Sequence, residues 1–85
     1  MKTAVVILNW NTEGFLRKFL PGLLHSVRNV EGAEVIVADN DSTDGSMELM
    51  HEMFPDVRTI EFDNNCGCTG GYNRAFKEIE AEYFL

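Results

Sequence analysis

The chain has 85 residues, of which 45% are hydrophobic and 25% are charged, a balance typical of a soluble globular domain. This length is enough for one core and too short for two domains. Asp and Glu number 14 against 7 Lys and Arg, which gives a formal net charge of −7. Such a charge argues against a nucleic-acid partner and against an acidic membrane, because both require a basic surface.

The two cysteines, Cys66 and Cys68, are separated by one residue. A disulfide between them would be strained, so we expect free thiols and a reducing, cytoplasmic compartment. They could form half of a metal site, but only His25 and His51 could complete it, and both lie on distant helical patterns. The apolar run over residues 4–8 is too short for a signal peptide or a membrane span, so no membrane segment is predicted.

Four segments have the pattern of β-strands. Residues 4–8 and 34–38 are continuous apolar runs, as expected for strands covered on both faces. Residues 57–62 alternate polar and apolar side chains, which indicates an edge strand. Residues 83–85 resemble the opening of a fourth strand.

Helical periodicity separates these segments. Thr12 can cap a first helix, and Pro21 inside that helix predicts a kink or the start of a second short helix. Residues 47–54 predict another helix with its methionines on the buried face. Thr69 is the predicted N-cap of the last helix, whose apolar face runs from Tyr72 toward the end of the chain.

This alternation predicts an α/β fold: a three-layer α/β/α arrangement around a parallel, Rossmann-like sheet with right-handed crossovers. We expect the strand order 3-2-1, with the last short strand beside the first. Because the sequence stops as a strand begins, we expect residues 1–85 to be the N-terminal part of a larger domain, truncated at the start of its fourth strand. The strand edge left exposed predicts a homodimer of this piece.

The acidic loop over residues 39–46 follows the second strand. Ligands of open α/β sheets bind outside the carboxyl ends of the strands, so Asp39 is a candidate ligand group. A calcium loop counted from Asp39 would have Asp44 in place of its glycine and Met50 in place of its final glutamate. We therefore assign Asp41 and Asp44 to turn formation and helix N-terminal charge, not to metal binding.

The turn before the last helix is rich in glycine. Gly70 and Gly71 follow Thr69, and a helix N-terminus with such glycines favours an anion such as pyrophosphate. Arg74 could add a cation. The alternative is that the glycines only shape a tight connection. Neither a dinucleotide-binding G-x-G-x-x-G after the first strand nor a Walker G-K-[ST] is present.

Three loops are expected at the same rim of the sheet because each follows a parallel strand: residues 9–12, 39–46 and 64–71. The first loop supplies polar side chains and an aromatic ring. The second supplies an acceptor carboxylate, and the third supplies a helix start suited to an anion. A nucleotide base, its ribose and its phosphates need these groups. Trp10 either faces such a ligand or covers the sheet edge.

Three ordered motifs carry a resemblance to a known family. They are Val5-Val6-Ile7-Leu8-Asn9-Trp10-Asn11, then Val37-Ala38-Asp39-Asn40-Asp41-Ser42-Thr43-Asp44-Gly45-Ser46, then Asn65-x-Gly67-x-x-Gly70-Gly71-x-Asn73. Across essentially all 85 residues the chain resembles the N-terminal half of the nucleotide-binding domain of family 2 glycosyltransferases, inverting enzymes of the GT-A fold that use nucleotide-activated sugars. The run Gly70-Gly71-x-Asn73-Arg74 is most similar to the rhamnosyltransferase-type members.

The resemblance implies a role for each matching residue. Asp39 would accept a hydrogen bond from the pyrimidine ring N–H, and Asn9 and Asn11 would line the base and ribose pocket. The start of the last helix would lie beside the nucleotide. Tyr72 stands where many members have a basic residue, and whether Arg74 replaces that cation is open. The implied nucleotide-binding residues are Asn9, Asn11, Asp39, Gly70, Gly71, Asn73 and Arg74.

The resemblance also implies chemistry outside these residues. The family's D-x-D motif, which holds a divalent cation (Mn or Mg) on the diphosphate, and its catalytic base both follow the strand begun by residues 83–85. No catalytic or metal-binding residue is therefore assigned, and the piece alone is expected to be inactive. The parent would transfer a sugar from a UDP or dTDP donor to an acceptor such as a cell-surface polysaccharide. The alternative is a non-catalytic, self-associating α/β module without nucleotide binding.

Overall fold

The computed structural model describes all of residues 1–85, in which strands and helices alternate. The elements are β1 (Thr3–Asn9), α1 (Glu13–Val27), β2 (Ala33–Asp39), α2 (Ser46–Met53), β3 (Arg58–Glu61), α3 (Gly67–Glu78) and β4 (Tyr83–Phe84). The strands form one parallel sheet in the order β3-β2-β1-β4. The predicted α/β class, strand order and edge position of the third strand are confirmed.

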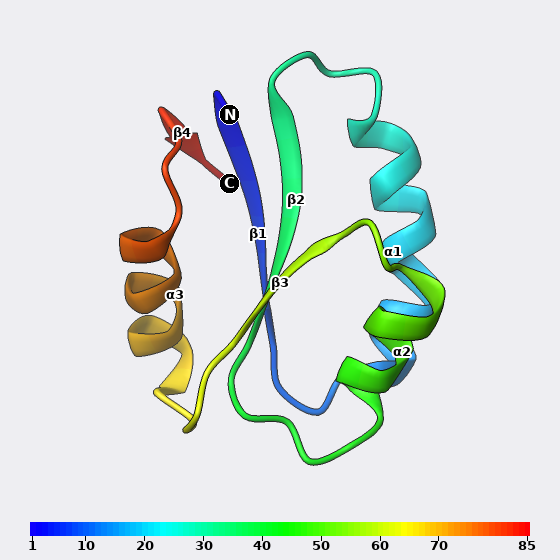
Figure 1. The fold of residues 1–85 in the computed structure, drawn as a ribbon, viewed down its shortest axis with the longest axis vertical. Coiled ribbons are helices and arrows are strands. Elements are labelled where there is room, and N and C mark those ends of the chain that lie inside the picture. Colours follow the sequence, from blue (N-terminus) through cyan, green and yellow to red (C-terminus); the bar gives the residue numbers. More distant parts are fainter.

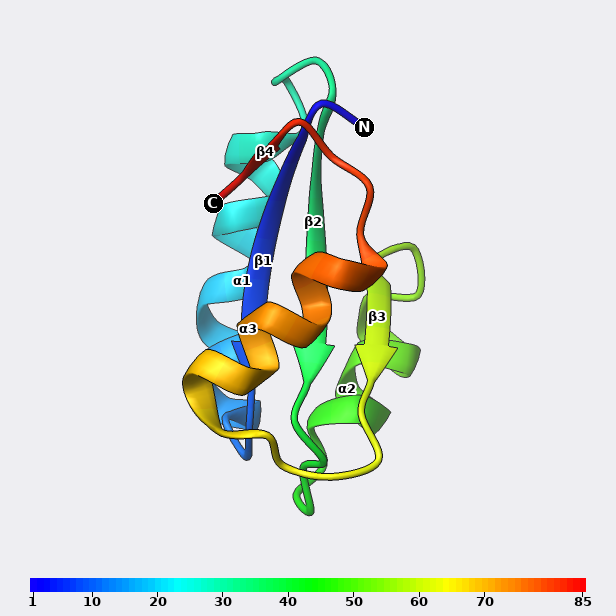
Figure 2. The same ribbon diagram turned by 90° about the vertical axis from the view of Figure 1, so that its left-hand side faces the viewer.

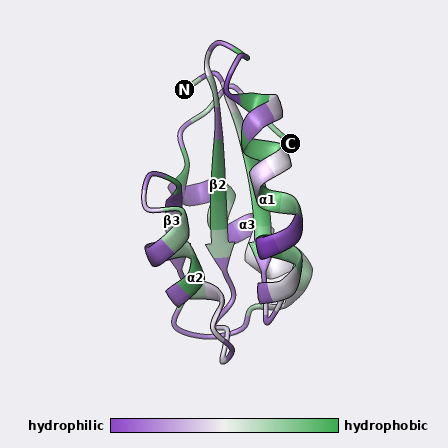
Figure 3. Ribbon diagram, turned by 90° about the vertical axis from the view of Figure 1, so that its right-hand side faces the viewer, coloured by the Kyte–Doolittle hydropathy of each residue, from purple (hydrophilic) through white to green (hydrophobic).

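Helices cover both faces of the sheet, with α1 and α2 on one side and α3 on the other (Figures 1 and 2). The alternation of side chains along β2 explains this arrangement. Val35 and Val37 pack with apolar side chains of α1 and α2, whereas Ile36 and Ala38 pack with α3. The central strand is therefore buried on both faces, and its ribbon is hydrophobic along much of its length (Figure 3). The predicted three-layer arrangement is confirmed.

The first two helices differ in detail from the prediction. Residues 13–27 form a single helix that runs through Pro21 and is not divided there. Pro21 is exposed, so its ring meets solvent on the outer face. In α2, Met50 is buried as expected, but Met53 is 57% exposed. None of the helices is both long enough and apolar enough to cross a membrane.

The last helix begins three residues earlier than predicted. Its N-cap is Cys66 instead of Thr69, and Gly67 is its first residue. Amide side chains replace the expected hydroxyl cap: Asn40 accepts a hydrogen bond from the Cys66 N–H at 3.0 Å, and Asn65 accepts one from the Gly67 N–H at 2.8 Å. Asn40 is distant in sequence, so no local pattern could reveal this cap.

Candidate functional site

The carboxyl ends of β1 and β2 are joined by a buried polar network. The Asn9 amide donates to Asp39 Oδ1 at 2.8 Å, and the Ser42 hydroxyl donates to the same oxygen at 2.6 Å. Asp39 Oδ2 accepts the Ser42 backbone N–H at 3.0 Å. Asn9 and Asp39 are almost fully buried. Two carboxylate oxygens offer about four acceptor positions, so one position on Oδ2 has no partner within the chain.

Asn11 extends this network toward solvent. Its backbone N–H donates to the Ser42 hydroxyl at 2.9 Å, and its side-chain oxygen accepts the Thr43 N–H at 2.7 Å and the Asp44 N–H at 3.2 Å. Asn11 has φ +52° and Asp41 has φ +64°. This left-handed conformation is uncommon outside glycine, although Asn and Asp tolerate it best. The first two loops are thus fastened together by side chains.

Asp44 binds the starts of two helices. Its carboxylate accepts the Ser46 N–H of α2 at 2.9 Å and the Glu13 N–H of α1 at 3.2 Å. Slight burial acts to raise the pKa of Asp44, but these hydrogen bonds and one from the Ser46 hydroxyl outweigh it, so the pKa lies below its usual value. The turn and helix-charge role predicted for Asp44 is confirmed.

The third loop is held by Asn40, a residue that the sequence did not single out. Its Nδ2 donates to the Gly67 carbonyl at 3.0 Å, while its Oδ1 accepts the Cys66 N–H. Gly71 packs behind it: a Cβ there would lie 2.7 Å from Leu8 Cδ1 and 3.0 Å from Asn40 Nδ2. The chain therefore needs glycine at position 71 so that α3 can approach the sheet. The helix N–H groups left free for an anion belong to Cys68 and Thr69.

A pocket of about 310 Å³ lies between these loops. Residues of all three loops and the end of β1 line it: Leu8, Trp10, Thr12, Asn40, Asn65, Gly67 and Cys68. Trp10 is half exposed and contributes an aromatic wall. The pocket thus combines an aromatic surface, amide side chains and a helix start at one rim of the sheet.

None of the seven predicted nucleotide-binding residues lines this pocket, although Asn9, Asn11 and Asp39 are next to lining residues in the chain. Asn73 is exposed on α3, and Gly70 packs near Cys66. Arg74 lies over the Phe62 ring, 4.6 Å from its centre. Its guanidinium donates to Asp63 at 3.2 Å, to Asn64 at 3.1 Å and to the Cys66 sulfur at 3.6 Å. Contacts with Cys66 and Asp63 raise the pKa of Arg74, so its cation is bound to the turn before α3.

The chain does not gather a metal-binding set. No three Asp, Glu, His or Cys side chains lie together in residues 1–85 in a way that could hold an ion. Both cysteines are free thiols.

The fold and this pocket define a Rossmann-like α/β domain, the class that binds its ligands at the carboxyl ends of parallel strands. Residues 4–85 match the family described as glycosyl transferase family 2. The chain belongs to this family, as the three ordered motifs predicted.

Curated relatives from bacteria match the whole chain. The teichoic acid poly(glycerol phosphate) polymerase of Staphylococcus epidermidis is 29% identical over 99% of this chain. The poly(ribitol-phosphate) beta-glucosyltransferase of Bacillus spizizenii is 32% identical over 100% of it. The chain spans only 12% and 14% of the lengths of these two relatives.

Solved structures share the fold. TarS 1-349 of S. aureus in complex with UDP-GlcNAc matches with a TM-score of 0.82 and 25% identity, over 100% of this chain and 25% of that one. Its complex with UDP matches with a TM-score of 0.79 and 26% identity, over 100% and 27%. A mannosyltransferase from Pyrobaculum calidifontis, solved with GDP-Man and Mn2+, has a TM-score of 0.78 at 21% identity, over 93% and 24%.

Proposed function

We propose that residues 1–85 form the nucleotide-binding part of a glycosyltransferase that takes its sugar from a nucleoside diphosphate donor. The observation that carries this proposal is the rim pocket, in which Trp10, Asn40 and the start of α3 surround one space. An aromatic face suits a base, hydrogen-bonding amides suit a base edge or ribose, and a helix N-terminus suits phosphate. The family membership supports the reaction class.

UDP is the nucleotide that we favour over dTDP. TarS, which is 25–26% identical, was solved with UDP and with UDP-GlcNAc. In our proposal the free acceptor position of Asp39 receives the pyrimidine ring N–H, and Asn9 and Asn11 hold the surrounding loops in place. Gly70, Gly71 and Asn73 contribute the helix beside the diphosphate. Arg74 would have to leave its contacts with Asp63 and Asn64 to reach a phosphate.

The acceptor and the metal are proposed only by class. The relatives named for poly(glycerol phosphate) and poly(ribitol-phosphate) support an anionic cell-surface polymer as acceptor. A divalent cation, Mn or Mg, would neutralise the diphosphate, and its ligands would come from outside residues 1–85. The rhamnosyltransferase-like assignment stays a prediction. The free thiols support a cytoplasmic setting.

The nucleotide proposal is tested by thermal unfolding of the chain with UDP, dTDP and ADP. A ligand that binds the folded state alone at concentration c stabilises it by RT ln(1 + c/Kd), so at equal concentration the tighter ligand raises the midpoint more. We expect UDP to raise it more than ADP. Equal midpoints with and without every nucleotide would contradict the proposal.

As a second, non-catalytic candidate function we propose self-association through the edge of β1 that residues 1–85 leave unpaired. β4 pairs with Thr3 and Ala4 only, and Leu85 adds the last bond, to the Val6 N–H. By strand alternation the backbone of Leu8 points to the same side, and no strand of residues 1–85 pairs with it. An unpaired edge is a template for another strand, and we propose that a second copy of the chain binds here.

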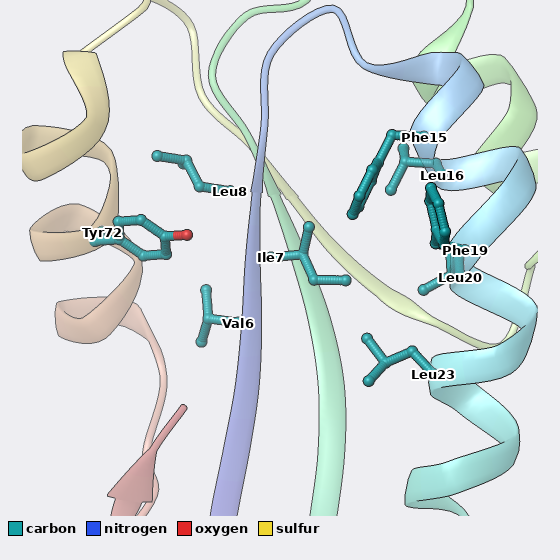
Figure 4. A pocket seen from close by; sticks show the side chains of 9 residues that line it. All are labelled: Val6, Ile7, Leu8, Phe15, Leu16, Phe19, Leu20, Leu23 and Tyr72. Carbon is teal, nitrogen blue, oxygen red and sulfur yellow. The ribbon is translucent and has the colours of Figure 1, made fainter.

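The surroundings of this edge support that proposal. An apolar pocket of about 450 Å³ lies along it, with Tyr72 on one side of β1 and Phe15 and Phe19 on the other (Figure 4). Phe15 and Phe19 are about half exposed, and their ring centres are 4.9 Å apart. Contact between two such surfaces would remove these rings from water.

A further inference from the structure

We propose that Asn40 is the positioning residue of the rim pocket: its side-chain amide fixes the start of α3 against the ends of β1 and β2 and thereby sets the affinity for the nucleotide. This inference rests on the proposed nucleotide-binding function. Asn40 is only 2% exposed and follows the last residue of β2. Its own backbone N–H donates to the Asn9 carbonyl at 2.8 Å, so its Cα position is fixed by the end of β1.

The amide of Asn40 has one orientation that satisfies its neighbours. The Cys66 N–H can only donate and the Gly67 carbonyl can only accept, and they lie 3.0 Å from Oδ1 and Nδ2 respectively. If the amide were flipped, its Nδ2 donor would face the Cys66 N–H donor and its Oδ1 acceptor would face the Gly67 carbonyl acceptor. Leu8 and Gly71 close the space behind it, since even one added carbon at position 71 would be 3.0 Å from Nδ2. The amide therefore acts as a rigid link.

This link joins two parts of the lining of one pocket, the end of β2 and the start of α3. Asn40, Gly67 and Cys68 line the same space as Trp10 and Thr12, which belong to the loop after β1. If the link is broken, the start of α3 is free to shift relative to Trp10. A ligand that contacts both the start of α3 and Trp10 then loses affinity, because binding must also restore the geometry of the pocket.

The substitution Asn40→Asp separates this positioning role from a general effect on folding. The carboxylate keeps the shape of the side chain and can still accept the Cys66 N–H, but at neutral pH it opposes the Gly67 carbonyl, acceptor to acceptor. Burial and the facing Gly67 carbonyl should raise the pKa of this introduced carboxyl above its usual value of about 3.9, and its protonated form regains a donor toward Gly67. The other titratable side chains around this position are Asp39 and Asp41 beside it in the chain, and Cys66 and Arg74 across the turn. They are present in the wild type as well, so the affinity ratio of wild type to variant isolates position 40.

UDP affinity should be measured by calorimetry for the wild type, Asn40→Asp and Asn40→Ala at about pH 7.5 and about pH 5. We expect Asn40→Asp to bind UDP roughly tenfold more weakly than the wild type at the higher pH and to recover most of this loss at the lower pH. Asn40→Ala has no titrating group at this position, so it should bind UDP weakly at both pH values. The proposal would be overturned if the wild type and Asn40→Asp bound UDP equally well at both pH values, or if the ratio of their UDP affinities did not change with pH.

A measurement on the unmodified chain guards against a variant that fails to fold. The Cys66 amide proton should exchange slowly with solvent, and more slowly still when UDP is bound, since Asn40 Oδ1 accepts it. Fast exchange of Cys66 in a chain that binds UDP would refute the positioning role and leave nucleotide binding intact. A folded wild type that does not bind UDP at all would instead refute the proposed function.

Discussion

The Asn9 amide donates a 2.8 Å hydrogen bond to the Asp39 carboxylate, and this bond joins the ends of two neighbouring strands at the rim where the pocket lies. Both side chains are buried, and no buried side-chain nitrogen or oxygen of the chain lacks a partner. Asp39 therefore holds the rim together whether or not a nucleotide is present. A substitution there should change both stability and binding.

Asp39→Ala should lower the free energy of unfolding by about 1–3 kcal/mol, because it removes the acceptor shared by the Asn9 amide, the Ser42 hydroxyl and the Ser42 N–H. Urea denaturation measures this loss. Asp63→Ala is the matched control, since the Asp63 side chain is 86% exposed and its ion pair with Arg74 lies at the surface. If Asp39→Ala and Asp63→Ala lost equal amounts of unfolding free energy, the buried network would stabilise the chain no more than the surface ion pair does.

Stability should fall in acid partly through Asp44. Its folded-state pKa lies below the usual 3.8, so the unfolded chain binds the proton first as the pH falls. The contribution of Asp44 is thus fully present above about pH 4 and is lost as the pH falls through the folded-state pKa. Asp44→Asn should flatten the stability curve between about pH 5 and pH 2.

Asp41→Asn is the control for this titration. Asp41 is exposed and has φ +64°, a conformation that Asn also tolerates. Its removal should leave the acid dependence close to that of the wild type. If Asp41→Asn flattens the curve as much as Asp44→Asn does, the helix-capping account of Asp44 is wrong.

Gly71→Ala should destabilise the chain by about 1–2 kcal/mol, because the new methyl group would meet Leu8 and Asn40 at 2.7 and 3.0 Å. Part of the strain can be relieved by movement of the Leu8 side chain. Gly14→Ala is the matched control: no atom lies within 4 Å of its added carbon, and alanine favours the helix by up to about 1 kcal/mol. Thermal unfolding should show shifts of opposite sign.

Self-association should depend on the aromatic rings beside β1. Phe19→Asp should weaken any dimer at least tenfold in sedimentation equilibrium, since it places a charge in an apolar contact. Met53→Asp is the control, because Met53 is 57% exposed, against 51% for Phe19, but lies on α2 away from this edge. A wild-type chain that sediments as a monomer at every concentration would refute the second-copy proposal.

The sequence was sufficient for the fold and for the loops that form the rim. Uninterrupted apolar runs predicted strands buried on both faces, and Asp39 was found because a carboxylate directly follows such a run. Asn40 was missed because its role depends on Cys66 and Gly67, two residues separated from it by a helix and a strand. The one sequence feature that could have pointed to Asn40 is its position as a polar residue at the end of a buried apolar run.

The start of α3 shows the same limit. Thr69 has the side chain of a typical N-cap, so local preference favoured it, but long-range amide bonds from Asn40 start the helix at Gly67. This shift moves Gly70 and Gly71 into the second turn. Gly71 then serves the close approach of the helix to Leu8, which sequence spacing alone could not distinguish from ligand binding.

The central claim is tested most directly by following the backbone amides of the ¹⁵N-labelled chain while UDP is added up to about 5 mM, a range that detects even weak binding. We predict saturable shifts confined to residues 9–12, 39–43 and 66–69, with ADP causing smaller ones and Asp39→Ala abolishing them. No shifts with UDP, or shifts that gather along the apolar pocket beside β1 instead, would contradict the assignment of this rim as a nucleotide site.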